Sequence, residues 1–136
     1  MTDKPVPPLH WVNPDNIALI AFGTDVSDRV QPYRGTAGRP YFEISDIECP
    51  PWQNRELLSF LDENECRQIA IFASTLTAGL TALAMMTGER GHDVFLVSDA
   101  VNSASSVWLK RLGKTHAILI DKHWFREEWN LVSGFD

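Results

Sequence analysis

Short apolar runs, bounded by turn residues, divide the chain at fairly regular intervals. Runs of this length that are rich in β-branched residues and lack strict alternation are typical of strands buried on both faces. We therefore expect strands at 17–22, 41–47, 68–73, 93–97 and 116–120. Pro50 and Pro51 predict the end of the second strand region.

The segments between the later runs have the spacing of amphipathic helices. Helices are expected at 53–63, 77–90, 103–112 and 123–132. In the first of these, the leucines at 57, 58 and 61 share one face. The stretch from Thr24 to Pro40 is rich in Gly, Pro, Asp and Arg and has no helical period, so it is interpreted as a long loop.

Strands that alternate with helices predict a parallel sheet joined by right-handed crossovers. The expected fold is a three-layer, doubly wound, Rossmann-like α/β domain with a mostly parallel sheet of about five strands. Residues 1–15 are proline-rich and are interpreted as an extended N-terminal arm, and residues 16–136 as a single domain. Ligands of such folds bind beyond the carboxyl ends of the strands.

Composition narrows the class of protein without naming a function. Of 136 residues, 44% are hydrophobic and 22% are charged, as in ordinary globular domains. The net charge of −6 argues against nucleic acid or an anionic membrane as the partner. No apolar stretch is long enough to span a bilayer, and two cysteines are too few for a disulfide framework. We expect a cytoplasmic protein.

One part of the sequence resembles a known family. The segment Gly91–Ala100, which follows a helix of small residues and a strand ending at Ala73, is similar to the isochorismatase-like (cysteine hydrolase) family. The resemblance extends to the C-terminal part, which carries Gly113 and then a helix rich in Trp and acidic residues. The resemblance implies a Rossmann-like fold. Active members of that family hydrolyse amide or vinyl-ether bonds with an Asp, a Lys and a Cys.

The three catalytic positions of that family are not kept here. The Asp position falls on Gly23, the Lys position on Asp46 or its neighbour Ser45, and the Cys position on Gly79. The family usually has a helix and a further strand between its first strand and its Lys strand, whereas only Gly23 to Tyr41, interpreted as a loop, is expected to separate them here. The resemblance therefore implies a shortened, catalytically degenerate domain that acts by binding a small ligand or by oligomeric assembly. The candidate pocket residues are Gly23, Asp46, Trp52, Thr75, Leu76 and Gly79.

A relocated catalytic centre is the first alternative. Cys49 could serve as a nucleophile for C–N hydrolysis, with Asp46 or Glu48 as its base. The structural interpretation of the same cysteine is a turn residue packed under Trp52. Cys66, just before a buried strand, is expected to be structural.

A receiver-like signalling domain is the second alternative. Domains of that kind have a similar length, a Ser or Thr after strand four and a Lys after strand five, and Ser98 and Lys122 fit this loosely. However, the first strand ends in Gly23-Thr24 without an acidic pair, and no phospho-acceptor Asp ends a middle strand.

No metal or cofactor site is predicted. Acidic residues are expected near the strand ends at Asp25, Asp28, Asp46, Glu48, Asp99 and Asp121. Several carboxylates at one edge could bind a divalent cation, but Asp is also favoured in turns and caps. The four histidines lack metal-ligand spacing. A Gly- and Arg-containing segment around Gly35 resembles an anion-binding loop, yet no strand leads directly into it and no helix follows.

Tryptophan is unusually frequent for so small a domain, with five in the chain. Because Trp supplies a large rigid area and one polar group, it is enriched at interfaces. We expect a homo-oligomer or a partner subunit to contact Trp108, Trp124 and Trp129. The alternative is that these side chains cover the core of a thin sheet.

Overall fold

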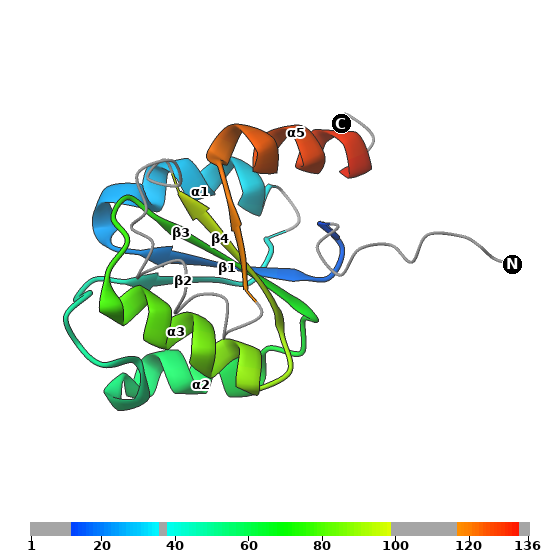
Figure 1. Ribbon diagram of the computed structural model, residues 1–136. Coiled ribbons are helices and arrows are strands. Elements are labelled where there is room, and N and C mark those ends of the chain that lie inside the picture. Colours follow the sequence, from blue (N-terminus) through cyan, green and yellow to red (C-terminus); the bar gives the residue numbers. More distant parts are fainter. Residues whose placement is uncertain (1–11, 36–37, 99–116, 134–136) are drawn as a thin grey trace, which may run out of the picture.

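The computed structural model describes residues 12–35, 38–98 and 117–133, and these form layers around one sheet (Figure 1). The strands are β1 (Ile17–Phe22), β2 (Tyr41–Ile44), β3 (Gln68–Ala73), β4 (Asp93–Ser98) and β5 (Ile118–Ile120). Within the described ranges all strand pairs are parallel, in the order β2-β1-β3-β4-β5. The predicted α/β fold is confirmed.

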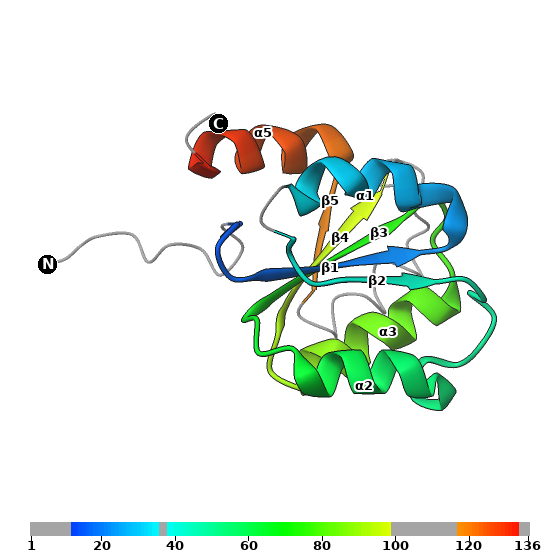
Figure 2. The same ribbon diagram turned by 180° about the vertical axis from the view of Figure 1, so that it is seen from behind.

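Helices cover both faces of this sheet. They are α1 (Ser27–Arg34), α2 (Arg55–Glu63), α3 (Ala78–Glu89) and α5 (Lys122–Ser133), with short 3-10 turns η1 (Thr24–Val26) and η2 (Pro51–Gln53). Two views from opposite sides place α1 and α5 on one face and α2 and α3 on the other (Figure 2). The helix expected at 103–112 lies outside the described residues.

Alternating residues of the strands supply two separate cores. In β1, Ala18, Ile20 and Phe22 pack toward α2 and α3, whereas Ile17, Leu19 and Ala21 pack toward α1 and α5. Because both faces are covered, every residue of β1 is buried. This double burial is the reason that the strand is an unbroken apolar run rather than an alternating one.

The interpretation of Thr24–Pro40 as a loop is wrong. Residues 24–26 form η1 and residues 27–34 form α1, even though Pro32 lies inside the helix. The pattern was missed because α1 has hardly any apolar stripe: Val30 is its one fully buried side chain, with Tyr33 half-buried beside it. The helix depends on packing against the sheet rather than on its own amphipathic pattern.

The other element boundaries differ from expectation by a few residues. Strand β2 ends at Ile44 instead of residue 47, because the chain turns at Ser45 and the Asp46 side chain accepts a hydrogen bond from the Glu48 amide at 3.0 Å. Helix α2 begins at Arg55, where Asn54 caps it by accepting from the Leu57 amide at 3.0 Å.

The residues just before β1 already pack on the domain. Val12 is 3% exposed and lies in the core under α5, and its amide donates to Glu128 at 3.2 Å. The Asn13 amide donates to the Gln68 side chain at 2.7 Å. Among the described residues, no helix is long and apolar enough to cross a membrane.

Candidate functional site

The strand order creates a switch point between β1 and β3. From β1 the chain passes to β2 on one side through α1, and it returns through α2 to β3 on the other side. Ligands of doubly wound sheets bind at such a reversal, beyond the carboxyl ends of the strands. Here the residues directly after the two strands are Gly23 and Ser74, so the neighbourhood of this pair is the expected place for a site.

The positions of the family's Asp and Cys converge on one residue, Ile47. A Cβ built on Gly79 would lie 3.1 Å from the backbone oxygen of Ile47. A Cβ built on Gly23 would lie 3.5 Å from the Cγ2 atom of Ile47. Ile47 is half-buried and packs against the core beside Phe22 and Leu76. An apolar side chain and its backbone therefore stand between the two positions that the resemblance made catalytic.

Gly23 has a further constraint of its own. Its φ is +112°, a conformation that residues with a side chain rarely adopt, and a Cβ there would lie 2.6 Å from the Oδ1 atom of Asp25. Asp25 is held in turn by Ser74, whose hydroxyl donates to the Asp25 Oδ2 atom at 2.5 Å. Gly23 is thus required by the turn that leads from β1 into η1.

The other predicted pocket residues come from separate elements. Trp52 lies in η2 with 61% of its surface exposed. Thr75 is exposed after β3, and Leu76 packs on the core that faces α2 and α3. Asp46 is exposed, and its carboxylate is engaged in the turn to Glu48.

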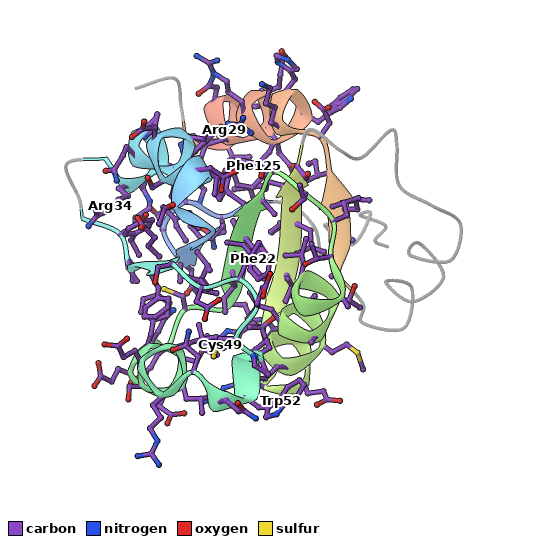
Figure 3. The ribbon with its side chains drawn as sticks, turned by 90° about the vertical axis from the view of Figure 1, so that its left-hand side faces the viewer. Phe22, Arg29, Arg34, Cys49, Trp52 and Phe125 are labelled. Carbon is purple, nitrogen blue, oxygen red and sulfur yellow. The ribbon has the colours of Figure 1, made fainter. Side chains whose placement is uncertain are left out.

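Cys49 is half-buried on the same side of the sheet as α2 (Figure 3). Its thiol donates to the carbonyl oxygen of Pro50 at 3.6 Å, and its amide donates to the Asp46 carbonyl at 3.2 Å. The thiol contact is therefore with backbone and not with the carboxylate of Asp46 or Glu48. This arrangement supplies no base to Cys49 from the residues that the sequence analysis paired with it.

A cavity lies on the opposite face, at the carboxyl ends of β3 and β4. Helices α1 and α5 form its walls, and we call it the α1–α5 cavity. Its volume is about 490 Å³, within the range of small-molecule sites. Its lining comprises Val26, Arg29, Pro32, Tyr33, Phe72, Ala73, Val97, Ser98, Lys122, His123, Arg126, Trp129 and Asn130. Figure 3 shows Arg29 on α1 beside α5, with Phe125 below.

Aromatic side chains stabilise one wall of the α1–α5 cavity. The Tyr33 ring lies 5.3 Å from the Phe72 ring and 5.1 Å from the Trp129 ring, measured between centroids. Arg39 lies over Trp129, with 4.9 Å from its guanidinium carbon to the ring centroid, and its Nε atom donates to the Pro14 carbonyl at 2.7 Å. Burial raises the pKa of the Tyr33 hydroxyl, and the nearby Arg126 partly opposes this. Tyr33 is therefore neutral at physiological pH.

The α1–α5 cavity could not be predicted from the sequence, for a definite reason. Its first wall is α1, which the sequence pattern did not predict, so Arg29 and Tyr33 were left in a loop. The available signal was on α5, where Lys122 and Arg126 are four residues apart and so share a face. The spacing of Lys122 and Arg126 indicates that two basic side chains lie together, but it does not indicate which other element they lie against.

The tryptophans divide between core and surface. Trp129 is 8% exposed and belongs to the core under α5, as the alternative interpretation of these residues has it. Trp124 is 72% exposed on the same helix. Trp108 lies outside the described residues.

Neither a metal cluster nor a receiver site is assembled in the part of the chain that the structure describes. No group of at least three His, Cys, Asp or Glu side chains there is placed to hold a metal ion. The strand order is shared with flavodoxin-like folds. However, the middle strand β3 is followed by Ser74 and not by an acidic residue that could accept a phosphoryl group.

Comparisons with known proteins point to one fold. No protein-family model and no curated protein matches the sequence. Among solved structures, the chain is similar to YcaC from Pseudomonas aeruginosa, an isochorismatase-family protein, in a structure with hexane-2,5-diol and covalent acrylamide. The TM-score is 0.55 at 13% identity, over 88% of this chain and 81% of that chain. At this identity the likeness establishes the fold alone, and the chain has an isochorismatase-like α/β fold.

Proposed function

We propose that this protein is a catalytically inactive isochorismatase-like domain that acts by binding a small ligand in the α1–α5 cavity. The observation that carries the proposal is the place of Ile47 between Gly23 and Gly79. A thiol at position 79 would begin from a Cβ only 3.1 Å from the Ile47 oxygen, so the backbone there would have to move. The three side chains of the family's chemistry are absent, and Ile47 occupies the space between two of their positions.

Ligand binding is favoured because the structure has a cavity at the carboxyl edge of the sheet, next to the switch point between β1 and β3. The α1–α5 cavity is at the carboxyl ends of β3 and β4, and it combines an apolar floor with polar and charged groups at the rim. Hydrolysis by Cys49 is less well supported, because the Cys49 thiol contacts the Pro50 carbonyl rather than a base.

The test combines an activity assay with ligand mapping. The purified chain is incubated with a panel of small amides, and Cys49→Ser and Cys66→Ser are assayed as a matched pair of thiol removals. We expect no turnover above background in any of the three proteins. In parallel, amide shifts in an NMR fragment screen are expected at Phe72–Ala73 and Val97–Ser98. Turnover that Cys49→Ser abolishes and Cys66→Ser retains would establish the hydrolase instead.

Assembly is a second candidate function, favoured by the surface of α5. Trp124 is 72% exposed and Leu131 is 59% exposed. They are seven residues apart, so they lie on the same face of the helix. We expect Trp124→Ser to lower the mass found by sedimentation, whereas Trp52→Ser, an exposed tryptophan in η2 on the other layer, leaves the mass unchanged. An unchanged mass in both variants would contradict assembly through α5.

A further inference from the structure

Basic side chains converge on the α1–α5 cavity from both of its walls. Arg29 comes from α1, and Lys122, His123 and Arg126 come from α5. Among the described lining residues there is no Asp or Glu. The chain as a whole carries a net charge of −6, so a lining whose described charged residues are all basic differs from the average of the sequence. A local excess of cations inside a concave surface attracts anions more strongly than the same charges on an open face.

The backbone at this edge adds to the same preference. Helix α5 begins at Lys122, so its positive end meets the cavity. One amide of the first turn is already satisfied, because the His123 N–H donates to the Asp121 carboxylate at 2.7 Å. Asp121 thus caps the start of α5 with its carboxylate. Ser98, at the end of β4, contributes a hydroxyl to the lining.

The apolar lining of the α1–α5 cavity favours an organic body on the anion. Phe72, Val97 and Trp129 form its base but are already almost fully buried, so the apolar lining that stays accessible to a ligand includes half-buried Tyr33 and exposed Pro32. A bare inorganic ion would leave this apolar surface unused, whereas a ring or chain would bury it. The basic side chains lie at the exposed rim, at a different level from the buried floor.

We infer that the ligand of the α1–α5 cavity is a small organic anion, whose carboxylate or phosphate group is held by Arg126, Arg29 and Lys122 while its apolar body lies against Tyr33 and Pro32. This inference rests on the proposed function, since it names the class of molecule that the cavity binds. An arginine pair offers the forked donors that suit both oxyanions.

The test uses four probes on the whole chain: benzoate, phenyl phosphate, inorganic phosphate and the neutral benzyl alcohol. Binding is followed by NMR titration of the amides of Phe72–Ala73 and Val97–Ser98. We expect benzoate or phenyl phosphate to bind at least about tenfold more tightly than benzyl alcohol, since a hydrogen bond to a charged group is worth about that ratio. Whichever of the two binds more tightly identifies the oxyanion.

Two variants and a control locate the anion. Arg126→Gln is expected to weaken the anionic probe about tenfold and to leave benzyl alcohol unaffected. Arg29→Gln tests the opposite wall independently. The control is Arg55→Gln, an exposed arginine on α2 across the sheet, which we expect to bind as the parent does. Thermal unfolding of each variant verifies that the fold is intact.

The remaining outcomes overturn the inference in distinct ways. Equal binding of benzoate and benzyl alcohol, unchanged by Arg126→Gln, would reject the anion class and leave ligand binding in the cavity established. Tight binding of inorganic phosphate alone would reject the organic body. A lack of binding by all four probes would also reject the inference. The inactive-domain proposal fails on a different result, namely turnover that depends on Cys49.

Discussion

The hydroxyl of Ser74 donates a hydrogen bond to the Oδ2 atom of Asp25 at 2.5 Å. The two residues are 49 positions apart in the chain, and they join the turn after β3 to η1 across the switch point of the sheet. In many doubly wound folds a ligand occupies this crevice. Here two of the polar groups at its mouth bind each other.

This pair has a measurable link to the conformation of Gly23. We expect Gly23→Ala to cost about 1–3 kcal/mol of unfolding free energy, because its positive φ strains a side-chain residue. Gly91→Ala is the matched control: its φ is +99°, and a Cβ there meets nothing within 4 Å. Gly23→Ala also displaces Asp25, so it is expected to cost about 1 kcal/mol more than the control. When Ser74 is also replaced by Ala, the additional cost of Gly23→Ala over Gly91→Ala is expected to disappear. If urea unfolding shows the same additional cost in that background, Gly23 is not coupled to the Ser74–Asp25 hydrogen bond.

Arg39 is expected to stabilise the position of α5. It donates to the carbonyls of Pro14 and Tyr33, at 2.7 Å and 3.1 Å, and lies over the Trp129 ring. Arg39→Ala is predicted to lower the unfolding free energy by about 1–3 kcal/mol. Arg39→Lys is not expected to restore it, because an ammonium lacks the planar fork. Denaturant unfolding measures the stability of both Arg39 variants, with Arg55→Ala as the control. Full stability of Arg39→Lys would contradict a role for the planar guanidinium group.

Two neighbouring aromatic residues on α5 are predicted to contribute very differently to the free energy of unfolding. Phe125 is fully buried against Phe72 and Phe95, with ring centroids 5.5 Å and 6.0 Å away. Phe125→Ala is expected to cost about 3–5 kcal/mol through the cavity it leaves. Trp124→Ala, on the exposed face, is expected to change the stability by about 0.5 kcal/mol or less. If thermal unfolding shows similar losses of stability for Phe125→Ala and Trp124→Ala, α5 does not pack on the sheet through Phe125 as described.

Cys66 predicts a pH dependence of stability. Burial raises the pKa of the Cys66 thiol above its ordinary value near 9.0. The folded state then holds the proton more tightly than the unfolded state, so this stabilisation is complete below the ordinary pKa and is lost as the pH rises through the folded pKa. We expect the unfolding free energy to fall more steeply above about pH 9 in the parent than in Cys66→Ala. Identical profiles from urea unfolding would contradict this.

Thiol labelling gives a kinetic measure of the same burial. The thiolate, and not the thiol, is the nucleophile that attacks iodoacetamide. Cys66 in the folded chain is therefore expected to react more slowly at a given pH than in the urea-unfolded chain, as peptide mass spectrometry can determine. Equal rates in the two states would indicate that the thiol is fully accessible.

The sequence alone determined the strands and most of the helices, because double burial leaves a direct trace in composition. Ile17–Phe22 is apolar throughout, and Gln68–Ala73 is apolar after its first residue, since each strand is covered on both faces. The glycines at positions 23 and 79, where the resemblance would place catalytic side chains, were also visible at this level. This follows from residue type at a given position and needs no knowledge of distance.

Only the tertiary structure decided where a ligand site can form. Helix α1 is held by contacts of Val30 and Tyr33 with the sheet, and such long-range contacts leave too weak a periodic pattern to be seen in advance. Without α1, Arg29 has no relation to Lys122 and Arg126. Likewise, nothing in the pattern around Ile47 shows that it lies between two glycines of different strand ends. Folding brings these residues together, because parallel strands carry distant segments to the same edge of the sheet.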